Sequence, residues 1–173
     1  MAATIQELQI TVGEDMRFVF MLQHDRFVEV DKETGELLCD TKLLGFFSSE
    51  DKCREAISHY KQQPGFKDHL EGFTFKKVEA DIDDYNDIPG TFEGYVYFLS
   101  HEWYDGEFDY VSYLGYYSKY QGAEEAQKKY CMDDDDYFKH QEGFVIDKYA
   151  IDQLEWKEGF CASEEMNEGV QEI

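Results

Sequence analysis

The sequence is poor in basic residues. Among its 173 residues, 16 lysine and arginine residues stand against 39 aspartate and glutamate residues, which gives a formal net charge of −23. A negative charge of this size keeps a protein soluble and repels nucleic-acid phosphates and anionic lipid headgroups. We therefore expect neither nucleic acid nor membrane as a partner, and we expect a basic protein instead.

Closely spaced cysteines are also lacking. The four cysteines, Cys39, Cys53, Cys131 and Cys161, form no Cys-x-x-Cys pair, and such pairs are a usual mark of zinc and redox sites. The sequence thus indicates neither a metal site nor a disulfide framework, and reduced thiols are the expectation.

Long apolar segments are missing as well. No segment approaches the ~18 consecutive apolar residues that a membrane-spanning helix needs. The first 16 residues lack the basic start and the apolar centre of a signal peptide. On these grounds we expect a cytoplasmic protein.

Recognisable catalytic motifs are absent from the sequence. It contains no triad-like arrangement, no phosphate-binding P-loop and no HExxH pattern, so we expect no cofactor and lean against an enzyme. His24 and His101 are the best catalytic candidates, because imidazole titrates near neutral pH. The alternative is that each forms a hydrogen bond at a strand end and holds the following loop. His69 and His140, which precede a Glu-Gly-Phe turn, are further candidates, and for them the alternative is a polar contact to the backbone of that turn.

What the sequence does contain is an internal repeat. Four successive segments match in the same order, which is the sign of a duplicated unit. The matches are Phe18–His24 with Tyr95–His101 at an offset of 77, Leu44–Ser48 with Leu114–Ser118 at 70, Glu55–Ala56 with Glu125–Ala126 at 70, and His69–Phe73 with His140–Phe144 at 71. The change in offset places an insertion in the first copy at residues 31–36.

Each copy is predicted to contain two strands, a helix and a third strand. Residues 17–24 are apolar on both faces, as in a central strand, and Ser48–Asp51 is typical of a helix start with acidic residues in the first turn. The predicted strands are 17–24, 42–47, 73–80, 95–101, 108–117 and 143–152, with helices from Ser48 to Pro64 and over 121–132.

The expected fold is therefore α+β, with two tandem ββαβ repeats, antiparallel sheets and one helix per repeat, related by a pseudo-twofold axis. Whether the two units extend one sheet or pack face to face stays open. The predicted divisions are a polar N-terminal lead (1–16), the first repeat (17–85), a linker (86–94), the second repeat (95–160) and an acidic tail (161–173).

Aromatic and acidic residues gather in the second half. Of 13 tyrosines, 11 follow residue 91, and the net charge is −9 over residues 1–90 and −14 over residues 91–173. Strand alternation and helix packing are expected to bury Tyr95, Tyr97 and Tyr130. Exposed rings among carboxylates form interface anchors. The predicted partner-binding residues are Trp103, Tyr104, Asp105, Glu107, Tyr110, Tyr113, Tyr120, Asp133, Asp134, Asp135 and Asp136.

The run of four aspartates, Asp133–Asp136, is a candidate calcium site. Calcium prefers carboxylate ligands, but an EF-hand needs alternating ligands, a glycine at position six and a glutamate at position twelve. Lys139 and Gln141 stand where ligands are required. An acidic contact patch is the preferred interpretation, and no metal is expected.

Several of these segments resemble a family of small bacterial domains of unknown function. Its members have a strand ending in histidine, a Leu-Gly-aromatic-Ser strand, a Glu-Ala helix and a closing Trp-x-Glu-Gly-Phe. The segments that carry the resemblance are Val96–His101, Leu114–Ser118, Glu125–Ala126, Glu142–Phe144 and Trp156–Phe160. It covers residues 18–85 and 95–160 as a tandem pair, although the first copy lacks the closing motif. The resemblance implies a fold and no activity.

Three functions are consistent with these features. The first is a non-enzymatic, acidic protein-binding module, similar in type to bacterial immunity proteins, that blocks a basic partner such as a nuclease toxin. The second is an enzyme that uses His24 and His101 across the pseudo-twofold axis. The third is a regulatory domain that senses a small ligand between the two copies. The oligomeric state is not indicated by the sequence.

Overall fold

Six strands and two helices make up the computed structural model, which describes residues 16–30, 35, 37–104, 106, 109–133, 137 and 139–160. The first half contains β1 (Phe18–Val30), β2 (Leu37–Phe47), α1 (Glu50–Tyr60), the short 3-10 helix η1 (Leu70–Gly72) and β3 (Phe73–Glu79). The second half contains β4 (Tyr95–Tyr104), β5 (Asp109–Tyr117), α2 (Tyr120–Asp133), η2 (Gln141–Gly143) and β6 (Phe144–Ala150). Both halves therefore follow the predicted order.

The strands form two antiparallel sheets of three strands each, in the orders β2-β1-β3 and β5-β4-β6. The registers of the two sheets correspond. His24 lies opposite Phe73 in the first sheet, and His101 lies opposite Phe144 in the second. The predicted α+β fold with two repeat-like units is confirmed, although β1, β2 and β4 extend several residues beyond the predicted strands.

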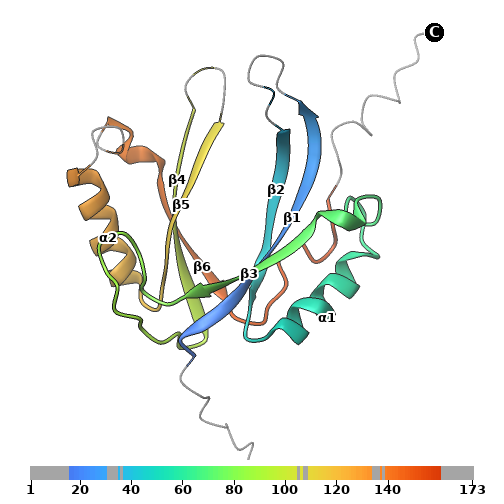
Figure 1. Ribbon diagram of the computed structural model, residues 1–173, viewed down its shortest axis with the longest axis horizontal. Helices are drawn as coiled ribbons and strands as arrows, with labels where there is room; N and C mark the ends of the chain where they lie inside the picture. The colour runs from blue at the N-terminus through green and yellow to red at the C-terminus, as the bar shows by residue number, and fades with distance from the viewer. Residues whose placement is uncertain are drawn as a thin grey trace, which may run out of the picture.

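The two sheets pack face to face between the two helices (Figure 1). Strand alternation sends Val19 and Met21 of β1 to the inner face, where they meet Val96 and Phe98 of β4 in one buried cluster. The sequence left open a continuous sheet or this arrangement. Because β1 and β4 are apolar on both faces, each sheet needs a covering layer on both sides, and face-to-face packing supplies the inner one.

The outer face of each sheet is covered by a helix. The Ser49 side chain caps α1 by accepting a hydrogen bond from the Lys52 amide at 3.3 Å. Cys53, Ala56 and Tyr60 of α1 then face the first sheet, and Ala123, Ala126 and Tyr130 of α2 face the second. These residues belong to two buried clusters, one between α1 and the first sheet (the α1 cluster) and one between α2 and the second sheet (the α2 cluster). Both are separate from the core between the sheets.

The repeated Leu-Gly pair forms a β-bulge in each sheet. Pairing shifts by one residue after Leu22 opposite Gly45, and again after Leu99 opposite Gly115. Gly45 has a φ of 134°, and a Cβ atom there would lie 2.6 Å from the Gln153 carbonyl oxygen. Glycine is therefore required at this bulge both by the backbone angle and by the close approach of another segment.

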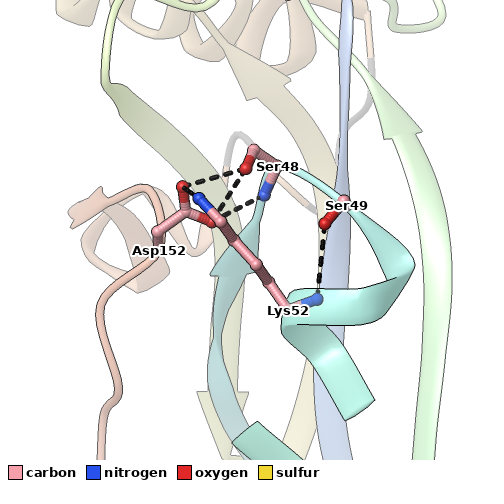
Figure 2. A network of polar contacts seen from close by, with 4 residues as sticks. All are labelled: Ser48, Ser49, Lys52 and Asp152. Atoms are coloured by element: carbon pink, nitrogen blue, oxygen red, sulfur yellow. Dashed lines mark hydrogen bonds and ion pairs between the residues drawn. The ribbon is translucent and has the colours of Figure 1, made fainter. Parts of the chain in front are cut away.

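That segment, residues 151–160, belongs to the second half of the chain but packs on the first. The Asp152 carboxylate accepts hydrogen bonds from the Ser48 amide at 2.8 Å and from the Ser48 hydroxyl, and the Lys52 ammonium lies 2.5 Å away (Figure 2). Further along, Phe160 lies edge-on against Phe66 of the α1 cluster, with ring centroids 4.8 Å apart. The second half thus closes the core of the first.

A corresponding contact joins the end of the first half to the second half. Asp81, which follows β3, accepts hydrogen bonds from the Ser118 amide at 2.8 Å and from the Ser118 hydroxyl at 2.7 Å. Asp81 and Asp152 correspond in the repeat, and both have a positive φ, 60° and 65°. Tyr130 donates to the Leu114 carbonyl at 3.1 Å and to Asp84 at 3.2 Å.

The residues predicted to link the two repeats are part of this contact. Phe92 is buried in the core between the sheets, and Asn86 donates to the Asp81 carbonyl. Among the described residues, no helix is long and apolar enough to cross a lipid bilayer. The predicted insertion at 31–36 and the tails 1–15 and 161–173 lie outside the described residues, apart from Gly35.

We expect Asp152→Asn to lower the free energy of unfolding by about 1–2 kcal/mol, because hydrogen bonds to a charged group contribute more than neutral ones. Asparagine keeps the shape and tolerates the positive φ, so the variant tests the charge. Urea unfolding measures the effect, and Asp68→Asn, at an exposed aspartate, makes the same change in net charge.

The effect should depend on pH. Partial burial opposes ionisation, but hydrogen bonds from Lys52 and Ser48 outweigh it and lower the pKa of Asp152. A carboxyl whose pKa is lower in the folded state contributes stability above its unfolded pKa of about 3.9, and loses it as the pH falls through the folded pKa. The difference between wild type and variant should therefore shrink in acid; a constant difference would contradict this assignment.

Candidate functional site: the cleft between the two hairpins

An open cleft of about 680 Å³ lies between the β1–β2 hairpin and the β4–β5 hairpin. In Figure 1 the two hairpins extend in the same direction from the region where the sheets pack together. Strands of both sheets line this inter-hairpin cleft. The lining residues are Cys39, Thr41, Leu43, Phe98, Ser100, Glu102, Val111, Tyr113, Asp147 and Tyr149.

The sequence of the inner faces explains why the sheets separate here. Along β4, alternate inner positions change from apolar Phe98 to polar Ser100 and charged Glu102. Along β1, apolar Met21 is followed on the same face by Asp25. Two apolar faces bury each other, whereas two polar faces stay hydrated. The core between the sheets therefore ends where these strands become polar, and a cleft opens beyond it.

Carboxylates and neutral phenols determine the electrostatics of the cleft. Burial raises the pKa of Tyr113, and the nearby Asp25 and Glu102 carboxylates raise it further. Burial and Asp147 together raise the pKa of Tyr149 to about 12. Both phenols thus keep their protons at neutral pH and can donate hydrogen bonds.

The cleft carries more negative than positive charge. Asp25 is held in place by the Thr41 hydroxyl, which donates to it at 2.7 Å. Lys76 lies over the Tyr113 ring with its ammonium 5.9 Å from the centroid. Among the described residues, the carboxylates of Asp25 and Glu102 lie near Tyr113, and those of Glu102, Asp147 and Glu155 lie near Tyr149, so they outnumber the ammonium of Lys76. Such a cleft attracts a cationic group.

Exposed apolar side chains stand along the same inner faces, nearer the tips. Phe27 on β1 and Tyr104 on β4 correspond in the repeat and are 54% and 61% exposed. Val111 on β5 is 53% exposed and lines the cleft itself. Apolar residues gathered at the mouth of a cleft mark an interaction surface more often than residues scattered singly.

The structure divides the predicted partner-binding residues among several places. Tyr113 lies in the cleft and Tyr104 at its rim. Trp103 faces outward and stacks between Tyr110 and His140, with centroids 4.7 and 4.5 Å away.

Other predicted residues lie elsewhere on the second half. Tyr120 is exposed at the start of α2, near Tyr97, and Asp133 ends that helix. Asp105, Glu107, Asp134, Asp135 and Asp136 lie outside the described residues. Of the tyrosines expected to be buried, Tyr130 is buried and Tyr97 half-buried, while Tyr95 is 44% exposed at the end of β4 opposite the hairpin tip.

The histidines are not brought together. His24 is buried against Phe66 and Phe73, and its Nε2 lies 2.8 Å from the His69 carbonyl oxygen. His101 is buried on the α2 side, with Nε2 2.7 Å from the His140 carbonyl oxygen.

Each of these histidines thus ties a strand to the turn before β3 or β6, which is the structural alternative that the sequence offered. Neither lines the inter-hairpin cleft. Within the part of the chain that is described, no group of three or more potential ligands is placed to hold a metal ion.

Sequence reasoning missed most of the cleft. Asp25, Phe27, Lys76, Glu102 and Asp147 were not singled out. The repeat alignment could have found Phe27, because it corresponds to Tyr104. Asp25, Lys76, Glu102 and Asp147 could be found only by knowing which faces of the two sheets are opposite each other.

Comparison with known protein families gives a match in the first half of the chain. Residues 17–88 match the model of a family described as a domain of unknown function, DUF7336. The match covers the first ββαβ unit and agrees with the predicted likeness to a small domain of unknown function. No curated protein and no solved structure matches the chain. The comparisons therefore suggest no activity, and the site must be interpreted from its own chemistry.

Replacing His24 by glutamine tests its structural role. Burial lowers the pKa of His24, so the folded state favours the neutral ring, and the stability it contributes is present above about pH 6.5 and lost as the pH falls below that value. Glutamine keeps an N–H donor but does not titrate. We expect His24→Gln to unfold more easily at pH 7 and to lose less stability than wild type between about pH 7 and 5. Urea unfolding at both pH values measures this, and equal losses would contradict it.

Proposed function

We propose that this protein is a non-enzymatic, acidic protein-binding module whose inter-hairpin cleft takes up a basic segment of a partner protein. The observation that carries the proposal is the combination of carboxylates inside the cleft with exposed apolar side chains at its rim. Carboxylates favour cationic side chains and reject anionic ones. Aromatic rings such as Tyr104 add contact area at low cost in conformational entropy.

The chemistry of the cleft also suggests the kind of partner. A nuclease holds nucleic-acid phosphate in a site rich in lysine and arginine. The carboxylates of Glu102 and Asp147 could pair with the lysine and arginine side chains that normally bind phosphate, and Tyr113 adds a phenol that donates a hydrogen bond. An immunity- or inhibitor-like role against a basic toxin, in the bacterial cytoplasm, fits this surface.

The charge of the whole chain supports the same proposal through the rate of association. A net charge of −23 produces a field that steers a basic protein toward the surface, and this attraction weakens as salt is added. Binding should therefore be fast at low ionic strength and slower at high ionic strength. A partner recognised by apolar contacts alone would not behave in this way.

Photo-crosslinking in cells of the source organism tests the location of the surface. A photoreactive phenylalanine analogue is placed at Tyr104, and in a matched variant at Tyr95, an exposed tyrosine at the other end of the same strand. We expect the analogue at position 104 to crosslink to a basic protein and the analogue at position 95 not to do so. In lysed cells, the yield at position 104 should fall when salt is added before illumination. Identical adducts from both positions, or adducts only with acidic proteins, would contradict the proposal.

Neutralising the cleft tests the role of its charge. The crosslinked protein is purified, and its affinity is measured by calorimetry. We expect Glu102→Gln with Asp147→Asn to weaken binding by about a hundredfold or more, because each of the two lost charge pairs contributes on the order of 1.5 kcal/mol or more. The control is Glu55→Gln with Glu71→Gln, at two exposed positions of the first half outside the cleft, which makes the same change in net charge. Equal weakening by both pairs would show that only overall charge matters.

A further inference from the structure

The two halves contain a pair of corresponding cavities, each beside the start of a helix. The cavity in the first half is lined by residues of α1 and by Asp152, and the cavity in the second half by residues of α2 and by Asp81. Each lining residue of the first cavity corresponds in the repeat to a lining residue of the second, which has further residues on its wall. The pairs are Phe47 with Tyr117, Lys52 with Gly122, Glu55 with Glu125, Ala56 with Ala126, His59 with Lys129, Asp152 with Asp81 and Leu154 with Asp83.

In the first half, an ammonium group occupies this place. The Lys52 side chain crosses the start of α1 and brings Nζ to 2.5 Å from Oδ2 of Asp152, whose other oxygen accepts the Ser48 amide (Figure 2). The positive end of the helix dipole disfavours a cation here. The ion pair with the aspartate and its two serine hydrogen bonds outweigh that effect.

In the second half, the aspartate and the serine remain but the lysine is gone. Asp81 accepts both hydrogen bonds from Ser118, as Asp152 does from Ser48. Glycine stands at position 122, and a Cβ built on it would lie 3.7 Å from Asp81 Oδ1 and 3.5 Å from Tyr117. These are ordinary contact distances, so the space where the lysine side chain would begin is open.

The cavity in the second half is larger than its counterpart, and linker residues within 86–93 form part of its wall. Its volume is about 710 Å³, compared with about 350 Å³ for its counterpart. Asp83, Glu93 and Glu125 line it together with Asp81, and two lysines, Lys119 and Lys129, also lie on its wall. Carboxylates thus outnumber cations around an opening whose counterpart holds an ammonium.

We propose that this cavity binds the primary ammonium group of an aliphatic amine, with Asp81 holding it as Asp152 holds Lys52. The alkyl chain lies along the open face of Gly122, where the lysine side chain runs in the other half. This site is separate from the inter-hairpin cleft: the two sets of lining residues have no member in common. It therefore stands or falls independently of the proposed function.

The experiment uses n-butylammonium, which is the lysine side chain cut off at Cβ. The full-length protein is titrated at a fixed ionic strength of about 0.15 M, and the backbone amide signals of Ser118 and Gly122 are followed by NMR. We expect saturable shifts at these two amides. n-Butanol, of the same length but without charge, should produce none. Shifts that do not saturate, or that n-butanol reproduces, would overturn the proposal.

Two variants test whether residue 52 or 122 decides which half can bind the amine. Gly122→Lys supplies the missing ammonium and should weaken n-butylammonium binding by at least about tenfold, whereas Gly122→Ala, which leaves the space open, should retain it. Lys52→Ala opens the cavity beside Asp152 and should create a second saturable response at the Ser48 amide. Unchanged binding in Gly122→Lys, checked to be folded by its amide spectrum, would overturn the proposal.

A last comparison identifies the source of the amine. A lysine residue blocked at both ends presents the same ammonium with a peptide backbone attached. If it shifts the Ser118 and Gly122 signals as strongly as n-butylammonium does, the cavity accepts a lysine side chain of another protein. If only n-butylammonium does so, the ligand is a free amine. Both results support an ammonium site, and the failure of both compounds to bind would overturn it.

Discussion

The fold depends on an exchange of chain segments between its two halves. In each half, an aspartate follows the last strand: Asp81 in the first half and Asp152 in the second. Its carboxylate accepts hydrogen bonds from the amide and the hydroxyl of a serine that follows a strand in the other half. The positive φ of both aspartates turns the chain toward its neighbour. Beyond this turn the segment packs beside the other half's helix. Tyr60 of α1 accordingly donates to the Glu155 carbonyl, and Tyr130 of α2 donates to Asp84.

A physical reason for the exchange is the size of each unit. A domain of roughly 60–70 residues buries too small a share of its surface to be more than marginally stable. Here each sheet is apolar on both faces, and one helix covers only the outer one. The second sheet covers the inner face, and the exchanged segment adds Leu154 and Phe160 to the α1 cluster. Neither half is therefore complete without the other.

The halves are alike where they hold the fold together and differ where they meet solvent or ligands. The serine, aspartate, tyrosine and histidine of the exchange and of the strand ends occur in both. In contrast, Lys52 corresponds to Gly122, and inner-face Lys76 corresponds to Asp147. The first difference opens a cavity beside Asp81. The second makes one wall of the inter-hairpin cleft acidic, so differences between the copies account for both candidate sites.

The sequence by itself determined the class of fold, the order of elements, the start of α1 and the faces of β1, because these depend on local periodicity and capping. It also determined that His24 and His101 are equivalent. Only the tertiary structure decided that the sheets pack face to face, that residues 151–160 cover the first half, and which tyrosines are exposed. Ser48 and Asp152 are 104 residues apart, and no local pattern specifies such a contact. The cleft escaped sequence reasoning for the same reason, since its walls come from strands whose mutual orientation is fixed by packing of the whole chain.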